Sequence, residues 1–262
     1  VKPLAAPGDV PKPTPPASRI AALEAQSLCS LQEQVELDRR LCRAARRGED
    51  CRRLLLQGAR PNSGCGSAPA LAHAVASGSE PVVRQLLFHG ADIEAADNNG
   101  DRPLVIAILH GHVHLARLLL EAGACPDEPD GHGDTPLICA AVSGQVEMVE
   151  ALLRGGADVE ATDPDGDTPL ICAAMNGGAE VIRALVRGGA DMDAPDDVGG
   201  DVPLIRAAVG GQKASVQALL ECCANVDAKT ASGQNVFEVA ELSGHREILE
   251  VLARARQAMG KE

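Results

Sequence analysis

Two short segments of the chain carry side chains that can bind metal ions. Three histidines alternate along His110-Gly111-His112-Val113-His114, and three aspartates alternate along Asp163-Pro164-Asp165-Gly166-Asp167. A zinc site needs further ligands at suitable spacing, and no nearby cysteine or carboxylate completes the histidine set. A calcium loop of the EF-hand type needs glycine at its sixth place and glutamate at its twelfth, where this chain has Thr168 and Ala174. The sequence therefore predicts no metal site and no cofactor.

Motifs for nucleophilic or phosphate chemistry are absent from the sequence. There is no Gly-x-Ser-x-Gly, no His-Glu-x-x-His and no Gly-rich loop followed by Lys-Ser or Lys-Thr. Cys139 and Cys172 lie in apolar segments, where cysteine is more often a small buried hydrophobe than a nucleophile. Nine cysteines without a Cys-x-x-Cys pair favour reduced thiols over a disulfide framework. We therefore predict that the protein is not an enzyme, has no catalytic residues, and resides in the cytoplasm or nucleus.

Composition narrows the class of protein further. The 262 residues carry a formal net charge of −13, which argues against generic nucleic-acid binding. Without Trp or Tyr, and with only two Phe, a core built on aromatic side chains is not expected. The longest apolar run, 104–109, is too short to span a bilayer. No signal peptide is expected, but the chain begins with Val1, so a fragment or a processed product with a removed targeting segment stays an alternative.

An internal repeat predicts the elements that position these side chains. The octapeptide Asp-Thr-Pro-Leu-Ile-Cys-Ala-Ala occupies 134–141 and recurs unchanged at 167–174, 33 residues later. Such a fixed period indicates stacked supersecondary units. One glycine marks each of six successive units, at steps of 33, 33, 33, 34 and 33 residues: Gly78, Gly111, Gly144, Gly177, Gly211 and Gly244. Gly48 lies 30 residues before the first of these, so the first unit is shortened.

The sequence of one unit predicts two helices and a projecting loop. Thr135 is suited to cap the first helix, with Pro136 at its first position, where the missing N–H has no consequence. Gly144 ends that helix, because a residue without Cβ accepts the left-handed conformation. Apolar residues over 146–153 predict a second helix, and the polar turn 163–166 leads to the next unit. A single unit buries too little apolar surface to fold alone, so several units must stack into one core.

The repeated residues resemble the ankyrin repeat family over 37–253. The family pattern of Thr-Pro-Leu, Gly-His and Gly-Ala-Asp is met at 135–137, 244–245 and 156–158, among other places. The resemblance implies an all-α ankyrin-repeat solenoid of about seven helix-turn-helix units with projecting hairpin-like loops. We expect units at 37–62, 63–95, 96–128, 129–161, 162–194, 195–228 and 229–253.

Two positions depart from the family pattern. The family histidine is replaced by aliphatic residues: Val105, Ile138, Ile171 and Ile205. This implies aliphatic packing in place of hydrogen bonding between Thr and His. In the family pattern, an asparagine lies two residues after the aspartate of Gly-Ala-Asp. This chain keeps the asparagine in the first unit, as Asn62, and elsewhere has an acid at this position: Glu94, Glu160 and Asp193.

The segments outside the array are predicted from composition and periodicity. Six prolines within 1–18 predict a disordered Pro-rich linker. Apolar residues over 19–36 predict an N-terminal helical extension that packs against the first unit, with Ser30 and Glu33 as a capping box that restarts the helix. Residues 254–262 are expected to form a C-terminal tail. The first and last units are expected to cap the array.

Charge is segregated along the chain. Residues 1–60 carry 11 Lys/Arg and 7 Asp/Glu, whereas 91–201 carry 5 Lys/Arg and 22 Asp/Glu. Part of the acidic surplus recurs just before four helix starts: Asp101, Asp134, Asp167 and Asp201. Stacking is expected to set these four aspartates in a row along the loop tips. One interpretation is that each complements the dipole of the helix that follows it, which contributes about 0.3–1 kcal/mol. The other is that the row binds a basic partner. Other acids, including Glu94, Asp127 and Glu160, favour a functional negative surface, with solubility as the alternative.

The opposite charge gathers in the first unit. Seven arginines lie within 39–53. They form either a solvated face of the cap or a site for an anionic partner, such as another copy's acidic loops.

The family resemblance implies that partners dock on a concave face formed by loop tips and the first helix of each unit. The matching residues are Asn98, Asn99, Asp101, Leu109, His110, His132, Asp134, Val142, Ser143, Asp165, Asp167, Met175, Asn176, Asp201 and Val209. Four of them align as an apolar stripe, unless they are partly buried packing residues: Leu109, Val142, Met175 and Val209. Since the chain lacks Trp and Tyr, any aromatic or Arg anchor would come from the partner.

The sequence thus predicts a non-enzymatic scaffold or adaptor for protein–protein interaction. A monomer would bind a basic or Arg-containing segment of another protein on its acidic concave face. Neither nucleic acid nor membrane is an expected partner. The alternatives are a regulatory or targeting ankyrin region of a longer enzyme or channel, and an independent enzyme.

Overall fold

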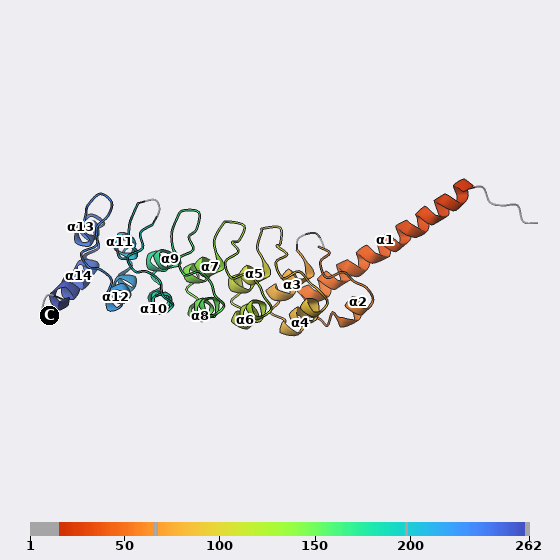
Figure 1. Cartoon of the computed structure of the whole chain (residues 1–262), viewed down its shortest axis with the longest axis horizontal. Coiled ribbons are helices and arrows are strands. Elements are labelled where there is room, and N and C mark those ends of the chain that lie inside the picture. Colours follow the sequence, from red (N-terminus) through yellow and green to blue (C-terminus); the bar gives the residue numbers. More distant parts are fainter. Residues whose placement is uncertain (1–15, 65, 67, 197–198, 260–262) are drawn as a thin grey trace, which may run out of the picture.

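The fold is a row of stacked helix pairs. The structure, a computed structural model, describes residues 16–64, 66, 68–196 and 199–259. Within these residues it contains fourteen α-helices, and the only β-pairing is one isolated bridge between Lys229 and Asn235. Figure 1 shows the helices pairing into successive units with a loop projecting from each. The predicted all-α solenoid of helix-turn-helix units is therefore confirmed.

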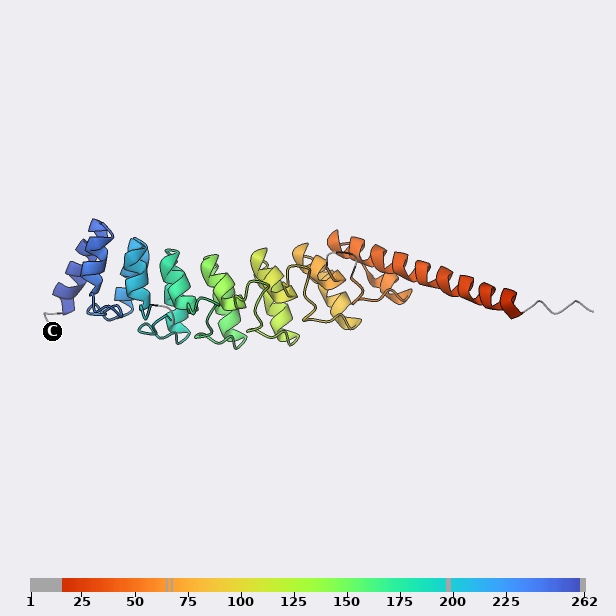
Figure 2. The same ribbon diagram turned by 90° about the horizontal axis from the view of Figure 1, so that it is seen from above.

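Each unit contributes one inner and one outer helix. The inner helices are α1 (Pro16–Arg46), α3 (Ala70–Ala76), α5 (Pro103–Leu109), α7 (Pro136–Val142), α9 (Pro169–Met175), α11 (Pro203–Val209) and α13 (Val236–Leu242). The outer helices are α2 (Arg52–Leu56), α4 (Glu80–Phe88), α6 (Val113–Glu121), α8 (Val146–Arg154), α10 (Ala179–Arg187), α12 (Lys213–Glu221) and α14 (Arg246–Met259). The loops project beside the inner row, on the side away from the outer row (Figure 1), and the units follow one another along a single axis (Figure 2).

The repeated octapeptide forms the start of an inner helix, as its residue types require. The Thr135 hydroxyl oxygen accepts a hydrogen bond from the backbone N–H of Ile138 at 3.4 Å, and Thr168 does the same for Ile171 at 3.3 Å. Gly144 follows the helix with φ of 69°, in the left-handed region that favours glycine. The predicted cap and stop of this helix are confirmed.

The core is continuous because successive inner helices pack against one another from α1 to α13. Ile138 and Ile171, which stand at the family histidine position, are fully buried in this core. Full burial of such a side chain contributes about 1.5–3 kcal/mol. Ala140 and Ala141 are also buried, and their small size lets neighbouring helices approach closely.

The N-terminal helix differs from the sequence expectation. α1 is one helix from Pro16 to Arg46, so it does not restart at Ser30. Its last turns serve as the inner helix of the first unit, with Leu41 and Ala45 buried. Its earlier part projects beyond the stack (Figures 1 and 2), and Leu31 and Val35 are exposed rather than packed as a cover. Most of the predicted linker 1–18 lies outside the described residues.

The C-terminal end of the stack is also helical. α14 continues to Met259, beyond the predicted start of a tail at 254. Among the described residues, no helix has both the length and the apolar character that a membrane crossing requires.

Candidate functional site

A row of apolar side chains lies exposed along the inner helices. Each member is the last residue of its helix, and the exposed fractions are 55% for Leu109, 48% for Val142, 38% for Met175, 48% for Val209 and 74% for Leu242. None of the five side chains is fully buried, so each presents apolar surface on the inner face. We call the five residues the inner-face row. The sequence analysis missed Leu242, although its place two residues before Gly244 matches that of the other four members before their glycines.

Polar neighbours of this row bond to their own helices. The His110 ring nitrogen Nδ1 lies 2.9 Å from the carbonyl oxygen of Ile106. The Asn176 amide nitrogen donates to the carbonyl oxygen of Cys172 at 2.8 Å. Both side chains, like that of Ser143, are exposed, so their remaining polar atoms face solvent.

One aspartate in each of four loops has a structural role that the sequence analysis did not predict. Asp163 Oδ1 accepts hydrogen bonds from the backbone N–H groups of Asp165 at 2.9 Å and Asp167 at 2.8 Å. Equivalent pairs of bonds reach the equivalent residue in three other units, and we call the four the loop aspartates: Asp97, Asp130, Asp163 and Asp196. A side chain that accepts from the backbone in this way fixes a tight turn.

The four aspartates predicted to form a row at the loop tips lie instead at the loop bases. We call them the entry aspartates: Asp101, Asp134, Asp167 and Asp201. Asp101 and Asp167 are only 9% and 7% exposed, and the other two are half-buried. Burial is the largest cause that raises the pKa of each, and neighbouring carboxylates add to it at Asp134. The tips themselves carry exposed polar residues: Asn98, Asn99, His132 and Asp165.

One arginine of an inner helix forms ion pairs with two of these aspartates. Arg206 stands on α11, and its Nη2 lies 3.2 Å from Asp167 Oδ2. Its Nε lies 3.4 Å from Oδ2 of the buried Asp196. Because Asp167 is already paired with Arg206, it is less available to a partner protein than the exposed Asp165.

Other acids form links between units. Glu94 accepts from the N–H of Cys125, Asp127 from that of Asp158 and Glu160 from that of Asp191, each at 2.8 Å. Asn62 makes the equivalent bond to Asp92 at 2.7 Å. Each of these acids therefore has a structural role as a link between successive units, in addition to the negative charge that it adds to the surface.

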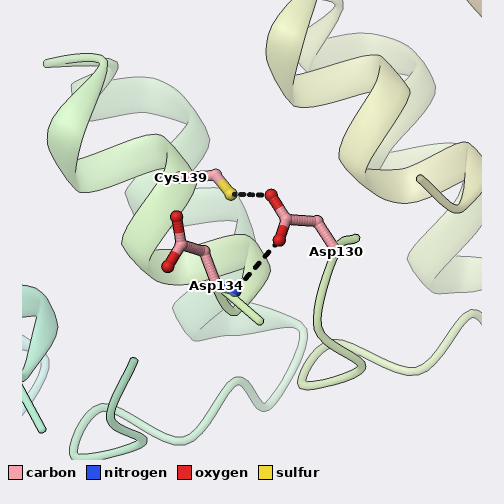
Figure 3. A group of neighbouring side chains, drawn as sticks. All are labelled: Asp130, Asp134 and Cys139. Carbon is pink, nitrogen blue, oxygen red and sulfur yellow. Dashed lines mark hydrogen bonds between the residues drawn. The ribbon is translucent and has the colours of Figure 1, made fainter. Parts of the chain in front are cut away.

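Two groups of side chains have the geometry of incomplete metal sites. Figure 3 shows Asp130, Asp134 and Cys139, whose ligand atoms lie within 4.8 Å of one another, and Asp163, Asp167 and Cys172 repeat the arrangement. The Cys139 thiol donates to Asp130 Oδ2 at 3.6 Å (Figure 3). Burial raises the pKa of Cys139 to about 12 and also raises that of Cys172. Because a metal binds the thiolate, both groups fit a protonated thiol better than a ligand set.

The three alternating histidines do not converge on one point. The ring centroids of His110 and His112 are 5.9 Å apart, and those of His112 and His114 are 6.0 Å apart. The His112 ring lies so close to Gly78 of the preceding unit that a Cβ there would come within 3.0 Å of it. His112 therefore helps to pack successive units.

Cavities lie between the inner helices and the loops. One of about 380 Å³ is lined by Leu109 and His110 together with Asn98 and Asp101. Another of about 430 Å³ is lined by Val209 and Leu242 together with Asp201 and loop residues of the last unit. The fold thus brings the inner-face row and the loops to one surface.

Comparison with known proteins agrees with this architecture. A family model for ankyrin repeats (three copies) matches overlapping segments at 41–130, 71–163, 125–196 and 143–230. The chain belongs to the ankyrin repeat family. A solved structure of the ankyrin repeat domain of Bcl-3, described as a unique member of the IkappaB protein family, is similar to this chain with a TM-score of 0.67 and 32% identity. The similarity covers 76% of this chain and 86% of that one. A search of curated proteins found no match.

Membership of the ankyrin family makes this chain a protein-interaction domain. Within the array, the predicted site residues fall into an exposed group and a group that supports the loops. The inner-face row and the loop tips are exposed, whereas the entry aspartates support the bases of the loops. The loop aspartates and the acids that link units could be found from sequence only by their recurrence in successive repeats.

Proposed function

We propose that the inner-face row and the adjoining loop tips bind an extended segment of another protein. The observation that carries this proposal is the alignment of five exposed apolar side chains on successive inner helices. Apolar side chains that gather on a surface and are rimmed by polar residues mark sites of protein association. The chain itself would act as a non-enzymatic, monomeric scaffold or adaptor.

The spacing of the units suggests the form of the partner. Packed neighbouring helices lie about 8–10 Å apart, and an extended chain advances about 3.3–3.6 Å per residue. A partner with an aliphatic or aromatic residue at roughly every third position would place one such residue on each unit. Any Trp or Tyr anchor must come from the partner, since this chain has neither.

The charge of the loops favours basic residues between those anchors. Asp165 is exposed at a loop tip, and burial with neighbouring carboxylates raises the pKa of Asp134. A raised pKa means that the carboxylate is destabilised in the folded protein, so a Lys or Arg placed beside it would relieve unfavourable charge. Binding should therefore weaken as salt concentration rises. The compartment would be the cytoplasm or nucleus, where thiols such as Cys139 and Cys172 stay reduced.

The apolar part of the proposal is tested by capture of partners from cell extract. The double variant Val142→Asp/Met175→Asp changes the centre of the inner-face row, and Leu56→Asp/Phe88→Asp makes the same change at exposed sites on the outer helices α2 and α4. We expect the first variant to lose the partners that the wild type captures and the second to retain them. Thermal unfolding of both variants checks that the fold is kept. Unchanged capture by Val142→Asp/Met175→Asp would contradict the proposal.

A second pair of variants tests whether the acidic loop tips contribute to partner binding. Asp165→Lys reverses an exposed charge at a loop tip, and Glu147→Lys reverses an exposed charge on α8. For a captured partner, Asp165→Lys should weaken binding and reduce its dependence on salt, whereas Glu147→Lys should leave both close to the wild type. Equal effects of the two variants would show that only overall charge matters.

A further inference from the structure

The inner surface of the first unit carries a cavity unlike those of the other units. It has a volume of about 420 Å³ and lies between α1 and the chain at 60–63. Its walls contain four arginines: Arg39, Arg43, Arg46 and Arg60. The first three stand on one face of α1, because residues four and seven apart on a helix lie nearly above one another.

This cavity continues the surface of the inner-face row. Arg46 is the last residue of α1, as Leu109 is the last residue of α5. Its guanidinium lies 3.2 Å from the ring nitrogen Nε2 of His73, and His73 lines the neighbouring cavity that also contains Leu109. Burial and the charge of Arg46 lower the pKa of His73, which agrees with positive potential at this place. The inner surface thus changes from apolar and acidic to basic at its N-terminal end.

One of the four arginines is already occupied. The Arg60 side chain donates to Asp38 Oδ2 from Nε at 3.0 Å and from Nη2 at 2.8 Å. Oδ1 of Asp38 accepts from the Arg60 backbone at 2.8 Å and from Gln34 at 3.0 Å. Although burial raises the pKa of Asp38, these hydrogen bonds outweigh it and the net pKa is lowered. Asp38 is therefore satisfied and holds Arg60 at the wall of the cavity.

The other three arginines keep donors for a ligand. Arg43 pairs with Glu36 at 3.0 Å, but both side chains are more than half exposed, and such pairs contribute little. Arg46 contacts the imidazole of His73, and no described carboxylate lies within ion-pair distance of Arg39 or Arg46. A guanidinium presents a planar fork of donors that matches the oxygens of a carboxylate or a phosphate.

We infer that this cavity, the arginine pocket, binds an oxyanion on a peptide side chain, held by Arg39, Arg43 and Arg46. The carboxylate of Asp or Glu and the phosphate of a modified residue share this chemistry. The anion site does not depend on the proposed function. If the anion site and the proposed partner site are both correct, the basic and apolar part of the partner lies over the middle of the array. An acidic or phosphorylated residue of the same partner then lies at the first unit, and this fixes the direction of the partner along the stack.

Short probes test the pocket apart from the inner-face row. The probes are acetyl-Glu-Glu-Glu-amide and acetyl-phosphoserine-amide, with acetyl-Gln-Gln-Gln-amide as the neutral control. Each is titrated into the ¹⁵N-labelled chain while the arginine Nε–H signals are followed by NMR. We expect saturable shifts of Arg39, Arg43 and Arg46 with at least one anionic probe and none with the neutral probe. Binding of both anionic probes indicates a carboxylate site, and binding of phosphoserine alone indicates a site for a phosphorylated residue.

Matched variants separate the pocket from general positive charge. Arg39→Gln/Arg43→Gln/Arg46→Gln should weaken probe binding by about tenfold or more, since each lost ionic hydrogen bond is among the strong ones. The control removes the same charge from exposed arginines outside the pocket: Arg40→Gln/Arg47→Gln/Arg53→Gln. Thermal unfolding checks both variants, and the single Arg39→Gln, at an exposed side chain, gives a second test if the triple variant unfolds.

Three results would overturn the inference: no saturable binding of either anionic probe, equal binding of the neutral probe, or equal weakening by the control variant. The row variant Val142→Asp/Met175→Asp should bind the probes as the wild type does. Failure of the arginine pocket and failure of the proposed partner site are therefore distinguishable.

Discussion

The carboxylate of Glu160 accepts a hydrogen bond of 2.8 Å from the backbone N–H of Asp191, in the next unit of the stack. This bond joins the exit of one repeat to the exit of the following one. Glu160→Ala should lower the free energy of unfolding by about 1 kcal/mol, because it removes the acceptor of a partly exposed N–H. Glu160→Gln keeps an acceptor oxygen at the same reach and should stay near the wild type. Urea unfolding measures both, and an equal loss in both variants would assign the effect to charge instead.

The sequence identified this position without revealing its role. Glu94 and Glu160 stand out as departures from the family asparagine, and the sequence predicts a surface role for them because they add to an acidic segment. Their bonding partners are 31 residues away in sequence and are brought near only by stacking. The period of the repeat predicts that neighbouring loops lie side by side, but it does not say which backbone N–H faces which carboxylate.

The loop aspartates should matter more to stability than the exposed loop-tip acids. Asp163→Ala removes an acceptor of two backbone N–H groups, so we expect a loss of about 2 kcal/mol in the free energy of unfolding. Asp165→Ala changes an exposed side chain two residues away and should stay within about 0.5 kcal/mol of the wild type. Chemical unfolding of the pair measures the difference. Similar values for the two variants would mean that the side chain of Asp163 does not fix the loop.

Two residues of α9 offer a direct comparison of core and surface. Ile171 is fully buried and Met175 is 38% exposed. Ile171→Ala should cost about 2–5 kcal/mol, through lost burial and the cavity left behind. Met175→Ala should change stability by about 0.5 kcal/mol or less and should instead weaken partner binding. A large loss of stability in Met175→Ala would show that the inner-face row belongs to the core.

Periodicity was enough to predict the row but not the burial of the acids beside it. Leu109 and Val142 stand at one fixed place in successive repeats, which defines a shared face of the inner helices. Asp134 also recurs at a fixed place, but whether it points to a loop tip or supports a loop base depends on the path of the loop. That path is set by the side chain of Asp130, which accepts from the backbone N–H of Asp134 at 2.9 Å.

The raised pKa of Asp134 gives a pH-dependent prediction. A carboxyl group whose pKa is raised by folding favours the folded state below its ordinary pKa of 3.8, and this contribution is lost as the pH rises through the folded pKa. Asp134→Asn carries no such charge, so the variant should be more stable than the wild type near neutral pH. The difference should shrink as the pH falls toward about 4.

Thermal unfolding of Asp134→Asn across this range makes the measurement, and Glu247 provides a control of opposite sign. A hydrogen bond from Lys213 lowers the pKa of Glu247, so Glu247→Gln should not gain stability at neutral pH. A stabilising effect of Asp134→Asn that does not change with pH would contradict the assignment to charge.

The cysteines should separate by their rates of alkylation. Cys125 and Cys223 are exposed, whereas Cys139 and Cys172 are buried with pKa values raised first by burial and then by neighbouring aspartates. The thiolate is the reactive form, so iodoacetamide should modify the exposed pair first and the buried pair only after unfolding. Mass spectrometry of the labelled peptides gives the rates, and labelling in urea shows whether all four react similarly once exposed. Rapid labelling of Cys139 in the folded protein would mean that its proton is not held against Asp130, and the carboxylate–thiol groups would then have to be reconsidered as ligands.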